Sequence, residues 1–505
     1  MIKLLRSTLI CIILIYGTNY TQAQHPRERV WVLGSNPTIN GGYTNVIVDF
    51  SETETTFTLP DLEGVFSIDR TNASICDEEG RLILYSNSLM VADSFHRIIP
   101  NGDTLSNTFS YFNHVNIGFG YPQAATLLPW PHKEDEYMLI YGHHDLWPAE
   151  TIDESLNPKL FYAHIVGDQD GYRVVSKENL ILDEIQSMYN YAIPHKNGVD
   201  WWIMSTKYFT NEYNLFLLDS IGIELYHKKN IGHMPVDSGN VTGVTLSPNG
   251  KTIAKFKPLD GLELFDIDRS TGELSNYRHM EIPNLVWPQQ SSVAFSPSGR
   301  FLYFCDATQL YQVDMEAEDW RASTVLIDTF DGYLHENFWP TAFRDMRRTP
   351  DCRIFMAAGD NSIYLHVIHE PEKAGKACRF EQRAITLPDW QYGGLPNHPL
   401  FSLDTEYAHY CDSLISTTTH TVDPPSDHLY VWPNPTTGTL SFSWEETGRW
   451  HQAEIYSMQG HLINAKDISG THQSSFWLQD VPPGVYLLRL TDSNGHQVHR
   501  KVMKK

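Results

Sequence analysis

Two short clusters hold the residues best suited to chemistry. The stretch "YGHHDLW" brings together His143, His144 and Asp145, and the stretch "RDMRR" contains Arg344, Arg347 and Arg348. Imidazoles beside a carboxylate can bind a metal or move a proton, and arginines can hold a carboxylated ligand through paired hydrogen bonds. Consecutive strand residues point to opposite faces, so the two histidines cannot easily ligate one ion. We take both clusters as candidate ligand-binding residues. The alternatives are hydrogen bonding in a loop or core for the histidines and a solvated turn for the arginines.

Common enzyme signatures are missing from the chain. "HENFW" at His335 and "HEPEK" at His369 each lack the second histidine of a zinc-protease helix. There is also no nucleophile elbow of the GxSxG type and no phosphate-binding glycine loop. We expect no metal and no cofactor, and these motifs leave open whether the protein is an enzyme.

The elements that must position these residues are strands. "GVTLSPNGKTIAKF" and "SVAFSPSGRFLYFC" each place a Ser-Pro-x-Gly turn between two strand-like runs, which is hairpin chemistry. Weaker copies recur every 50 to 60 residues, with turns near Gly80, Asp135, Gly198 and Asp351. That period is typical of the four-stranded blades of a β-propeller.

The blade count follows from the strands at both ends of the repeats. Six hairpins precede a lone strand-like piece, "GGLPNHPLF", and the mature chain opens with "VWVLG", "NVIVDF" and "TTFTLP". We predict an all-β, seven-bladed propeller over residues 24–411. Its N-terminal strands, near Trp31 and Val46, are expected to close the ring by pairing with the segment after Gly394, which removes exposed sheet edges.

The first residues and the charge predict export. Residues 1–23 place Lys3 and Arg6 before a short apolar run and end in small residues, as a secretory signal peptide does. No later stretch is long and apolar enough to span a bilayer. The formal net charge of −24 argues against nucleic acid or an anionic membrane surface as partner.

Five cysteines follow the predicted signal peptide, without the spacing of a zinc site. Cys352 and Cys378 fall in one predicted blade, so we expect a disulfide between them, which requires Cα atoms within about 7 Å. The other cysteines are expected to be buried thiols.

Residues 412–428 are rich in Ser, Thr, Asp and Pro and read as a linker, because they cannot bury enough apolar surface to pack. Residues 429–505 hold seven short alternating segments, which predicts a small Ig-like β-sandwich. The stretch "VWPNPTTGTLSFSW" opens this domain, and Gly438 is expected to allow a positive φ in its turn.

The order "WPNPTTGTLSF", "AEIYSMQGHLI", "LQDVPPGVYLLRL" and a basic end resembles the type A C-terminal sorting domain of the type IX secretion system of Bacteroidota. The matching residues are Asn434, Pro435, Gly438, Gly460, Gly484 and Tyr486. The resemblance implies export to the medium or the cell surface. It also implies recognition by the type IX translocon and removal of the domain by a C-terminal peptidase.

The propeller region resembles the large secreted propellers of Bacteroidota in "TNASICDEEGRLILYSNSLMVADSFHRIIPNGDTL" and in the closing "GLPNHPLF". Its Ser-Pro-x-Gly hairpins also resemble YVTN and lactonase-type propellers and WD40-like repeats. These resemblances imply a propeller fold and a location outside the cell, but no particular activity.

Two functions from different classes are compatible with these observations. The first is a secreted or surface propeller that binds a glycan, a peptide or a partner protein. The alternative is a propeller hydrolase or lactonase with His, Asp and Glu converging at the channel mouth. The side chains that the fold brings together at the ring centre separate the two.

Overall fold

The computed structural model describes two compact units, residues 1–412 and 413–505. It describes residues 26–34, 45–50, 55–60, 66–107, 111, 114–116, 118–144, 158–187, 189–236, 243–282, 291–401, 403, 429–444, 450–457, 461–493 and 497–505. The predicted signal peptide, the predicted linker and Asp145 lie outside these residues.

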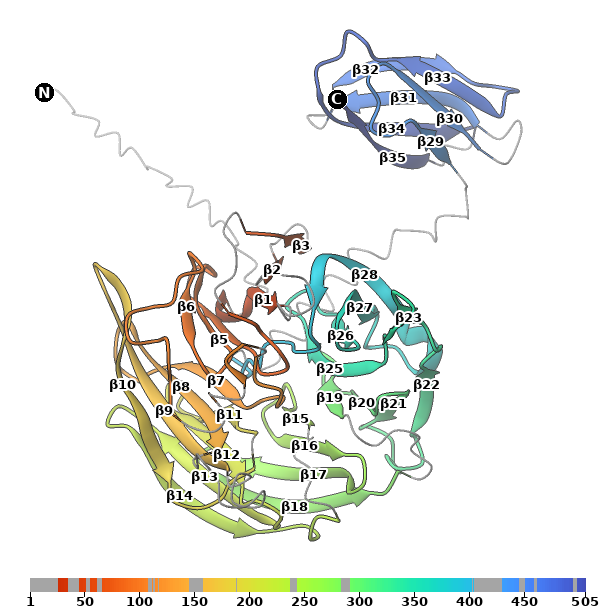
Figure 1. Cartoon of the computed structure of the whole chain (residues 1–505). Helices are drawn as coiled ribbons and strands as arrows, with labels where there is room; N and C mark the ends of the chain where they lie inside the picture. Colours follow the sequence, from red (N-terminus) through yellow and green to blue (C-terminus); the bar gives the residue numbers. More distant parts are fainter. Residues whose placement is uncertain are drawn as a thin grey trace, which may run out of the picture. The chain divides into compact units, whose positions relative to one another are not determined.

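The first unit is a ring of antiparallel sheets (Figure 1). The described residues contain seven ring sheets of three or four strands, whose strands follow in chain order: β1–β3 (Val30–Gly34, Asn45–Phe50, Thr55–Thr58); β4–β6 (Ala73–Cys76, Leu82–Ser86, Val91–Asp93); β7–β10 (Ala125–Pro129, Glu136–His144, Pro158–Asp168, Gly171–Leu182); β11–β14 (Tyr191–Pro194, Trp201–Thr206, Glu212–Leu218, Ile223–Asn230); β15–β18 (Gly243–Leu246, Thr252–Lys257, Gly261–Asp268, Glu273–Met280); β19–β22 (Ser292–Phe295, Phe301–Cys305, Gln309–Asp314, Val325–Thr329); β25–β28 (Phe343–Arg348, Ile354–Ala358, Ser362–Ile368, Phe380–Gln391). A hairpin, β23 (Leu334–His335) and β24 (Trp339–Pro340), and two short 3₁₀ turns, η1 (Pro26–Glu28) and η2 (Gly375–Cys378), complete the described elements of this unit.

The repeated turns form as the sequence predicts. β15 pairs with β16 and β19 with β20, each across a Ser-Pro-x-Gly turn. Gly250 and Gly299 have φ of 68° and 80°, a region that side-chain-bearing residues avoid. Their amides donate to the carbonyls of Ser247 and Ser296. The first strands of these sheets are buried on both faces, whereas outer strands such as β14 are half exposed.

A separate apolar cluster joins each ring sheet to the next, and this is what holds the ring together. The last of these clusters packs Trp31, Val46 and Phe50 from the first sheet against Phe355 and Val367 of the last one. The ring therefore closes by side-chain packing between the first and last sheets, which also lie side by side in Figure 1.

The predicted mode of closure is wrong in one respect. β2 pairs with β1 on one side and with β3 on the other, and the described residues 395–401 and 403 form no strand. A Cβ on Gly394 would lie 2.3 Å from the Asp69 carbonyl oxygen, and Pro396 and Pro399 lack the amide hydrogen that a ladder needs. A backbone hydrogen bond from the Tyr392 amide to the Gly34 carbonyl, at 3.1 Å, links this end to the first sheet.

An ion cluster adds to the closure. Asp360 of the last sheet accepts hydrogen bonds from Arg70, which precedes β4, and from Arg344 of β25, each at 2.9 Å. All three side chains are at least three-quarters buried. These ion pairs hold the pKa of Asp360 below its usual value although burial opposes them.

We expect Asp360→Asn to destabilise the propeller by about 2 to 4 kcal/mol, because it leaves two buried guanidinium groups without their counter-charge. Urea unfolding followed by tryptophan fluorescence measures the loss. Asp314→Asn, which breaks a half-exposed pair with Arg300, should cost less than about 1 kcal/mol. Equal losses in the two variants would contradict the closing role.

The predicted bridge between Cys352 and Cys378 is wrong. Cys378 is a buried free thiol, as are Cys76 and Cys305. Cys352 is disulfide-bonded, so its partner lies outside the described residues. The two cysteines lie in different environments. Cys378 packs in the core between two sheets, whereas Cys352 lies in the turn from β25 to β26.

The second unit is a β-sandwich with its own core. One sheet has the order β29-β30-β33 and the other β32-β31-β34-β35, from the strands Tyr430–Trp432, Thr439–Ser443, Trp450–Ser457, Leu462–Asp467, Gln473–Trp477, Gly484–Asp492 and Gln497–Lys504. Trp450, Phe442, Ile455, Leu488 and Val502 fill the space between them.

Candidate functional site in the centre of the ring

A plug segment, residues 393–401, crosses the centre of the ring. Asn397 donates its side-chain amide to the Ala125 carbonyl, the Thr126 hydroxyl and the Asn190 carbonyl at 2.7 to 3.3 Å. Its backbone amide donates to the Asn72 carbonyl at 2.8 Å. The plug thus ties together the inner ends of neighbouring sheets.

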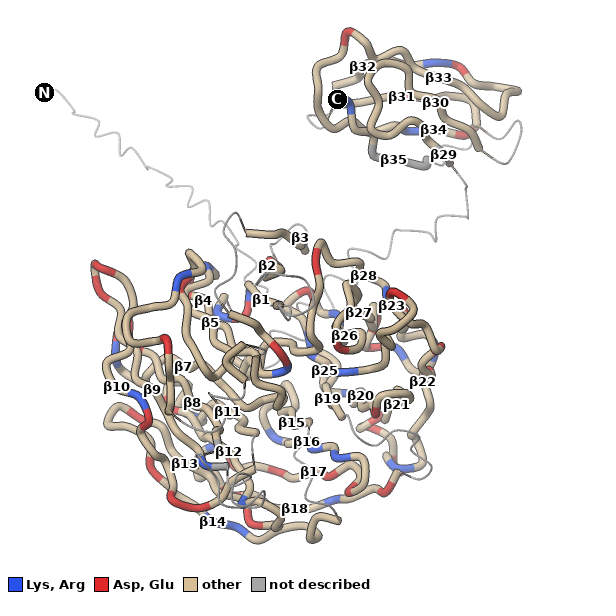
Figure 2. The backbone as a smooth tube through the Cα atoms, viewed as in Figure 1, with Lys and Arg blue, Asp and Glu red and all other residues tan. Residues whose placement is uncertain are grey.

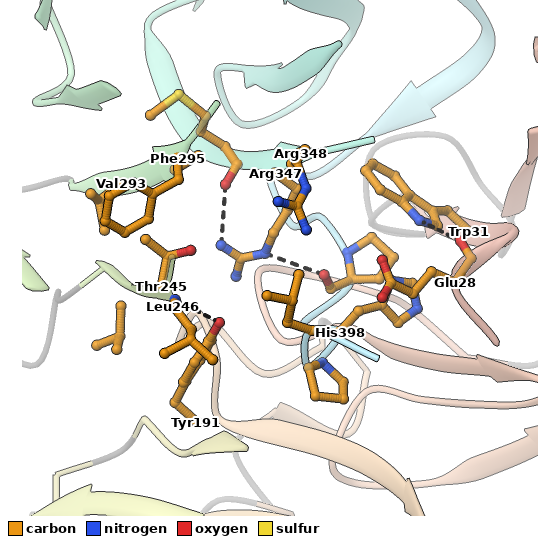
Figure 3. A pocket seen from close by; sticks show the side chains of 16 residues that line it. Glu28, Trp31, Tyr191, Thr245, Leu246, Val293, Phe295, Arg347, Arg348 and His398 are labelled. Atoms are coloured by element: carbon orange, nitrogen blue, oxygen red, sulfur yellow. Dashed lines mark hydrogen bonds between the residues drawn. The ribbon is translucent and has the colours of Figure 1, made fainter. Parts of the chain in front are cut away.

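A pocket of about 50 Å³ lies between the plug and the first strands of the following sheets (Figure 3). Such a volume holds a few water molecules or one small polar group. Its lining residues are Glu28, Trp31, Tyr191, Val244, Thr245, Leu246, Val293, Ala294, Phe295, Met346, Arg347, Arg348, Pro396, His398, Pro399 and Leu400.

Arg347, near the end of β25, lies in the middle of this pocket (Figure 3). Its Nε donates to the Pro396 carbonyl at 3.3 Å, and its Nη1 donates to the Met346 carbonyl at 3.2 Å and lies 3.1 Å from the Asp345 carboxylate. Its Nη2 is buried and has no hydrogen-bond partner. An unpaired buried guanidinium nitrogen beside a cavity is a place where a water molecule or an anion is expected.

Glu28 and Arg348 also line the pocket (Figure 3). Glu28 accepts a hydrogen bond from the Phe401 amide at 3.0 Å. Burial raises the pKa of Glu28 to about 7, against the lowering effect of Arg348. At neutral pH this carboxyl is therefore only partly ionised, so it does not fully neutralise the arginines.

His398 of the plug is half-buried, and its ring is uncharged at neutral pH. Its Nε2 lies 3.0 Å from the Ser74 hydroxyl, and burial lowers its pKa to about 3. Tyr191 also lines the pocket, and its hydroxyl oxygen accepts a hydrogen bond from the Leu246 amide at 2.9 Å. The pocket thus combines two arginines with one carboxyl and one neutral imidazole.

His143 of the predicted histidine cluster does not line this pocket. His143 is fully buried, and its two ring nitrogens are hydrogen-bonded to the hydroxyls of Ser88 and Ser106 at 3.0 and 2.5 Å. It also packs against Phe119 and Tyr141. His144 is described only as a strand residue, and Asp145 lies outside the described residues. His143 is therefore a hydrogen-bonded residue of the protein core.

The predicted arginine cluster divides in two. Arg344 pairs with Asp360 in the ring closure, whereas Arg347 and Arg348 line the pocket. Sequence reasoning missed Glu28 and His398, the other ionisable groups there. His398 stood in the recognised "GLPNHPLF" segment, as a polar residue among apolar ones; Glu28 carried no comparable signal.

Neither a metal cluster nor a membrane helix is found in the described part of the chain. No group of three or more His, Cys, Asp or Glu side chains there is arranged to hold a metal ion. No helix there is long and apolar enough to cross a membrane. Acidic and basic residues are interspersed around the ring rather than gathered on separate sheets (Figure 2).

The turn that opens the sandwich is fastened to its last strand. The Asn434 side chain accepts the Met503 amide at 2.8 Å, and the Thr436 amide donates to the Met503 carbonyl at 2.8 Å. Tyr486 is buried and donates its hydroxyl to the Pro482 carbonyl at 2.7 Å. Gly484 begins β34, opposite Lys504 of β35. Pro435 follows Asn434 in this turn, and Gly460 lies outside the described residues.

The prediction that Gly438 adopts a positive φ is wrong. Its φ is not in the left-handed region, and a Cβ at this position would meet no atom within 4 Å. The Gly438 amide donates to the Thr436 hydroxyl at 3.2 Å. The turn therefore depends on Asn434 and Thr436 rather than on the freedom of the glycine.

By fold, the protein is a β-propeller followed by a small β-sandwich. Residues 430–505 match the family described as the secretion system C-terminal sorting domain. The sandwich is therefore a type IX sorting domain, and it marks the protein as secreted or held at the cell surface.

Solved structures with propeller folds are similar to the chain at low identity. A proposed 6-phosphogluconolactonase from Bacteroides uniformis is 12% identical, with 72% of this chain and 97% of that chain covered and a TM-score of 0.46. Another, from Bacteroides fragilis, is 11% identical over 74% and 98% of the two chains, with a TM-score of 0.45. The propeller domain of Cps50 from Myceliophteria thermophila is 10% identical over 66% and 90%, with a TM-score of 0.38. A search of curated proteins found no significant match to this chain.

Proposed function

We propose that the protein is an extracellular binding protein, delivered by the type IX system, whose central pocket takes the carboxylate of a small ligand. The observation that carries this proposal is Arg347, whose Nη2 is buried beside the cavity without a partner. A carboxylate oxygen accepts a charge-assisted hydrogen bond from such an N–H group, and a carboxylate is small enough for this volume.

The charges around the pocket support an anionic ligand. Arg347 and Arg348 each bring a guanidinium cation to the pocket. Asp345 pairs with Arg347, and Glu28 adds negative charge near Arg348 as it ionises. Below pH 7 Glu28 is increasingly protonated, so a bound carboxylate meets less repulsion from it.

Titration calorimetry of the purified protein with acetate, succinate and gluconate tests the proposal, with glycerol as an uncharged control. We expect at least one carboxylate to bind, and Arg348→Gln to weaken that binding about 10- to 100-fold, the worth of one charge-assisted hydrogen bond. Arg300→Gln, on the outside of a sheet, should leave the affinity unchanged. Failure of all three carboxylates to bind would refute this ligand class.

Glu28→Gln gives an independent test that does not depend on losing an arginine. Binding to the unmodified protein should weaken as pH rises from 6 to 8, because Glu28 ionises, pairs with Arg348 and repels the incoming carboxylate. The glutamine can still accept the Phe401 amide but cannot ionise, so the affinity of the variant should be nearly constant over this range. A variant that keeps the same pH dependence would show that Glu28 does not face the ligand.

The hydrolase alternative rests on the same Glu28, since a carboxyl with a pKa near 7 is suited to acid–base catalysis. Incubation of the protein with gluconolactone, followed by acid release, separates the two proposals. Hydrolysis that is lost in Glu28→Gln would favour the enzyme over the binding protein.

A further inference from the structure

The β23–β24 hairpin is an addition to the ring, because it belongs to none of the seven sheets. It stands between the last strand of one sheet, β22, and the first strand of the next, β25, and lies beside β27 and β28 (Figure 1). The register pairs Leu334 with Pro340 and His335 with Trp339. The hairpin is thus a separate structural element inserted between two sheets of the ring.

The tip of the hairpin presents the aromatic ring of Phe338 to solvent. Phe338 is 69% exposed, and its ring stands perpendicular to that of Trp339 with centroids 4.7 Å apart. Glu336 and Asn337 both have left-handed backbone conformations, with φ of 50° and 59°. Non-glycine residues adopt this conformation at a cost, and such strain often accompanies a functional loop.

The base of the hairpin packs against the last sheet. The buried His335 ring packs edge-on against Tyr364 of β27 and Trp390 of β28, with centroids 5.4 and 4.7 Å away. The Thr341 amide donates to the Tyr333 carbonyl at 3.1 Å. An exposed aromatic tip on a fixed base loses little conformational entropy when it binds a partner.

Polar groups of both signs flank the exposed rings. Arg383 of β28 lies over the Tyr333 ring at 4.6 Å and pairs with Asp331, and Tyr333 itself is 42% exposed. Glu336 and Asn337 at the tip add a carboxylate and an amide. One arginine against two carboxylates leaves a small negative charge, so the surface disfavours a strongly anionic partner.

We propose that this hairpin, with the Phe338 ring as its stacking surface and Trp339 supporting it edge-on, binds a neutral sugar unit of an extracellular glycan. Sugar rings have an apolar C–H face that packs on an aromatic ring, and their hydroxyls both donate and accept hydrogen bonds. Asp331, Glu336, Asn337 and Arg383 supply the matching acceptors and donors around the rings. This site is separate from the central pocket, and its ligand needs no carboxylate.

Affinity electrophoresis of the purified protein tests the proposal, in gels that contain laminarin, xylan or mannan as neutral polysaccharides and alginate as an anionic one. We expect retardation by at least one neutral polysaccharide. Phe338→Ala should weaken it about 10-fold, the usual worth of an aromatic contact, and Phe338→Tyr should keep it. Phe95→Ala removes a similarly exposed ring elsewhere, 63% exposed, and should have no effect.

Three results would overturn the proposal. The first is that no neutral polysaccharide retards the protein, and the second is that Phe338→Ala binds as well as the unmodified protein. The third is retardation by alginate alone. If sedimentation shows self-association that Phe338→Ala abolishes, while no glycan binds, the hairpin is instead a contact between copies of the chain. Because Phe338 is so exposed, its substitution should not disturb folding, and circular dichroism checks this.

Discussion

Deleting residues 413–505 should leave a folded propeller that no longer reaches the cell surface or the medium. In a Bacteroidota host we expect the truncated protein to accumulate in the periplasm, with its extracellular amount falling to background. Cell fractionation and immunoblotting measure the distribution. The sorting domain is established by its family match, whereas the retention of the truncated chain is the prediction.

The physical basis of this prediction is that the two units have independent cores. The sandwich core uses residues from 429 onwards, and the seven clusters of the ring use none of them. The thermal unfolding midpoint of the propeller should therefore be unchanged by the deletion. A loss of cooperative unfolding would show that the propeller needs the sandwich to fold.

The reciprocal experiment transfers the domain. Residues 413–505 fused to a neutral periplasmic passenger should carry it outside the cell. Leu488→Ala, which opens a cavity in the sandwich core, should reduce that export because it costs about 2 to 5 kcal/mol of a small domain's stability. Leu487→Ala, a partly exposed neighbour on the same strand, is the matched control. Normal surface delivery of the truncated protein would refute the sorting role of this segment in the present chain.

The repeated hairpins were predictable from sequence because their signals are local. A Ser-Pro-x-Gly turn and the alternating runs on each side fix a β-hairpin within about 14 residues, as at Gly250 and Gly299. The order of the sheets then follows from the order of the hairpins. These features need no knowledge of distant contacts.

The closing segment was not predictable in the same way. "GGLPNHPLF" looks strand-like by composition, yet its role depends on Asn397, whose partners lie more than 200 residues away. The prolines and the close approach of Gly394 to Asp69 exclude a ladder, but that approach appears only in three dimensions. The same limit explains why the Cys352 pairing failed: position within one blade does not fix where a thiol points.

Some of the predicted site residues line the pocket, and others have a structural role elsewhere. Arg347 and Arg348 were found because a basic cluster is unusual on an acidic chain, whereas the neighbouring Arg344 serves the closure with Asp360. His143 looked functional because polar residues stand out in sequence, but paired serine hydroxyls satisfy it in the core. Sequence can identify a residue that needs a polar partner, and only the fold shows whether that partner is the protein itself.

Asp69 is expected to make the propeller less stable as pH rises from about 4 to 8. Burial raises the pKa of its carboxyl to about 8, with Asp360 adding to the rise and Arg70 opposing it. Between pH 4 and pH 8 the folded state therefore holds a proton that the unfolded chain has released. Stability falls with pH wherever the folded state binds more protons, by up to about 1.4 kcal/mol per pH unit for one group.

Asp69→Asn should remove this pH dependence, because an amide resembles the protonated acid and can still accept the Arg70 amide hydrogen, which now bonds Oδ1 at 2.7 Å. Between pH 5 and pH 7 the unmodified propeller should lose about 3 kcal/mol through Asp69, and the variant should be more stable at pH 7 by a similar amount. Glu28, whose pKa is raised to about 7, contributes in the same direction and remains in the variant. Urea unfolding at several pH values measures both slopes.

Asp103→Asn is the control, since this aspartate side chain is 71% exposed and should change neither slope nor stability. The ion pairs at Asp360 do not cause a similar loss of stability between pH 5 and pH 7. Its pKa is lowered, so its contribution is present at neutral pH and is lost only as pH falls below about 4. Equal slopes for Asp69→Asn and the unmodified protein between pH 5 and pH 7 would show that Asp69 is ionised in the folded ring. Its negative charge would then join Asp360 in balancing Arg70 and Arg344.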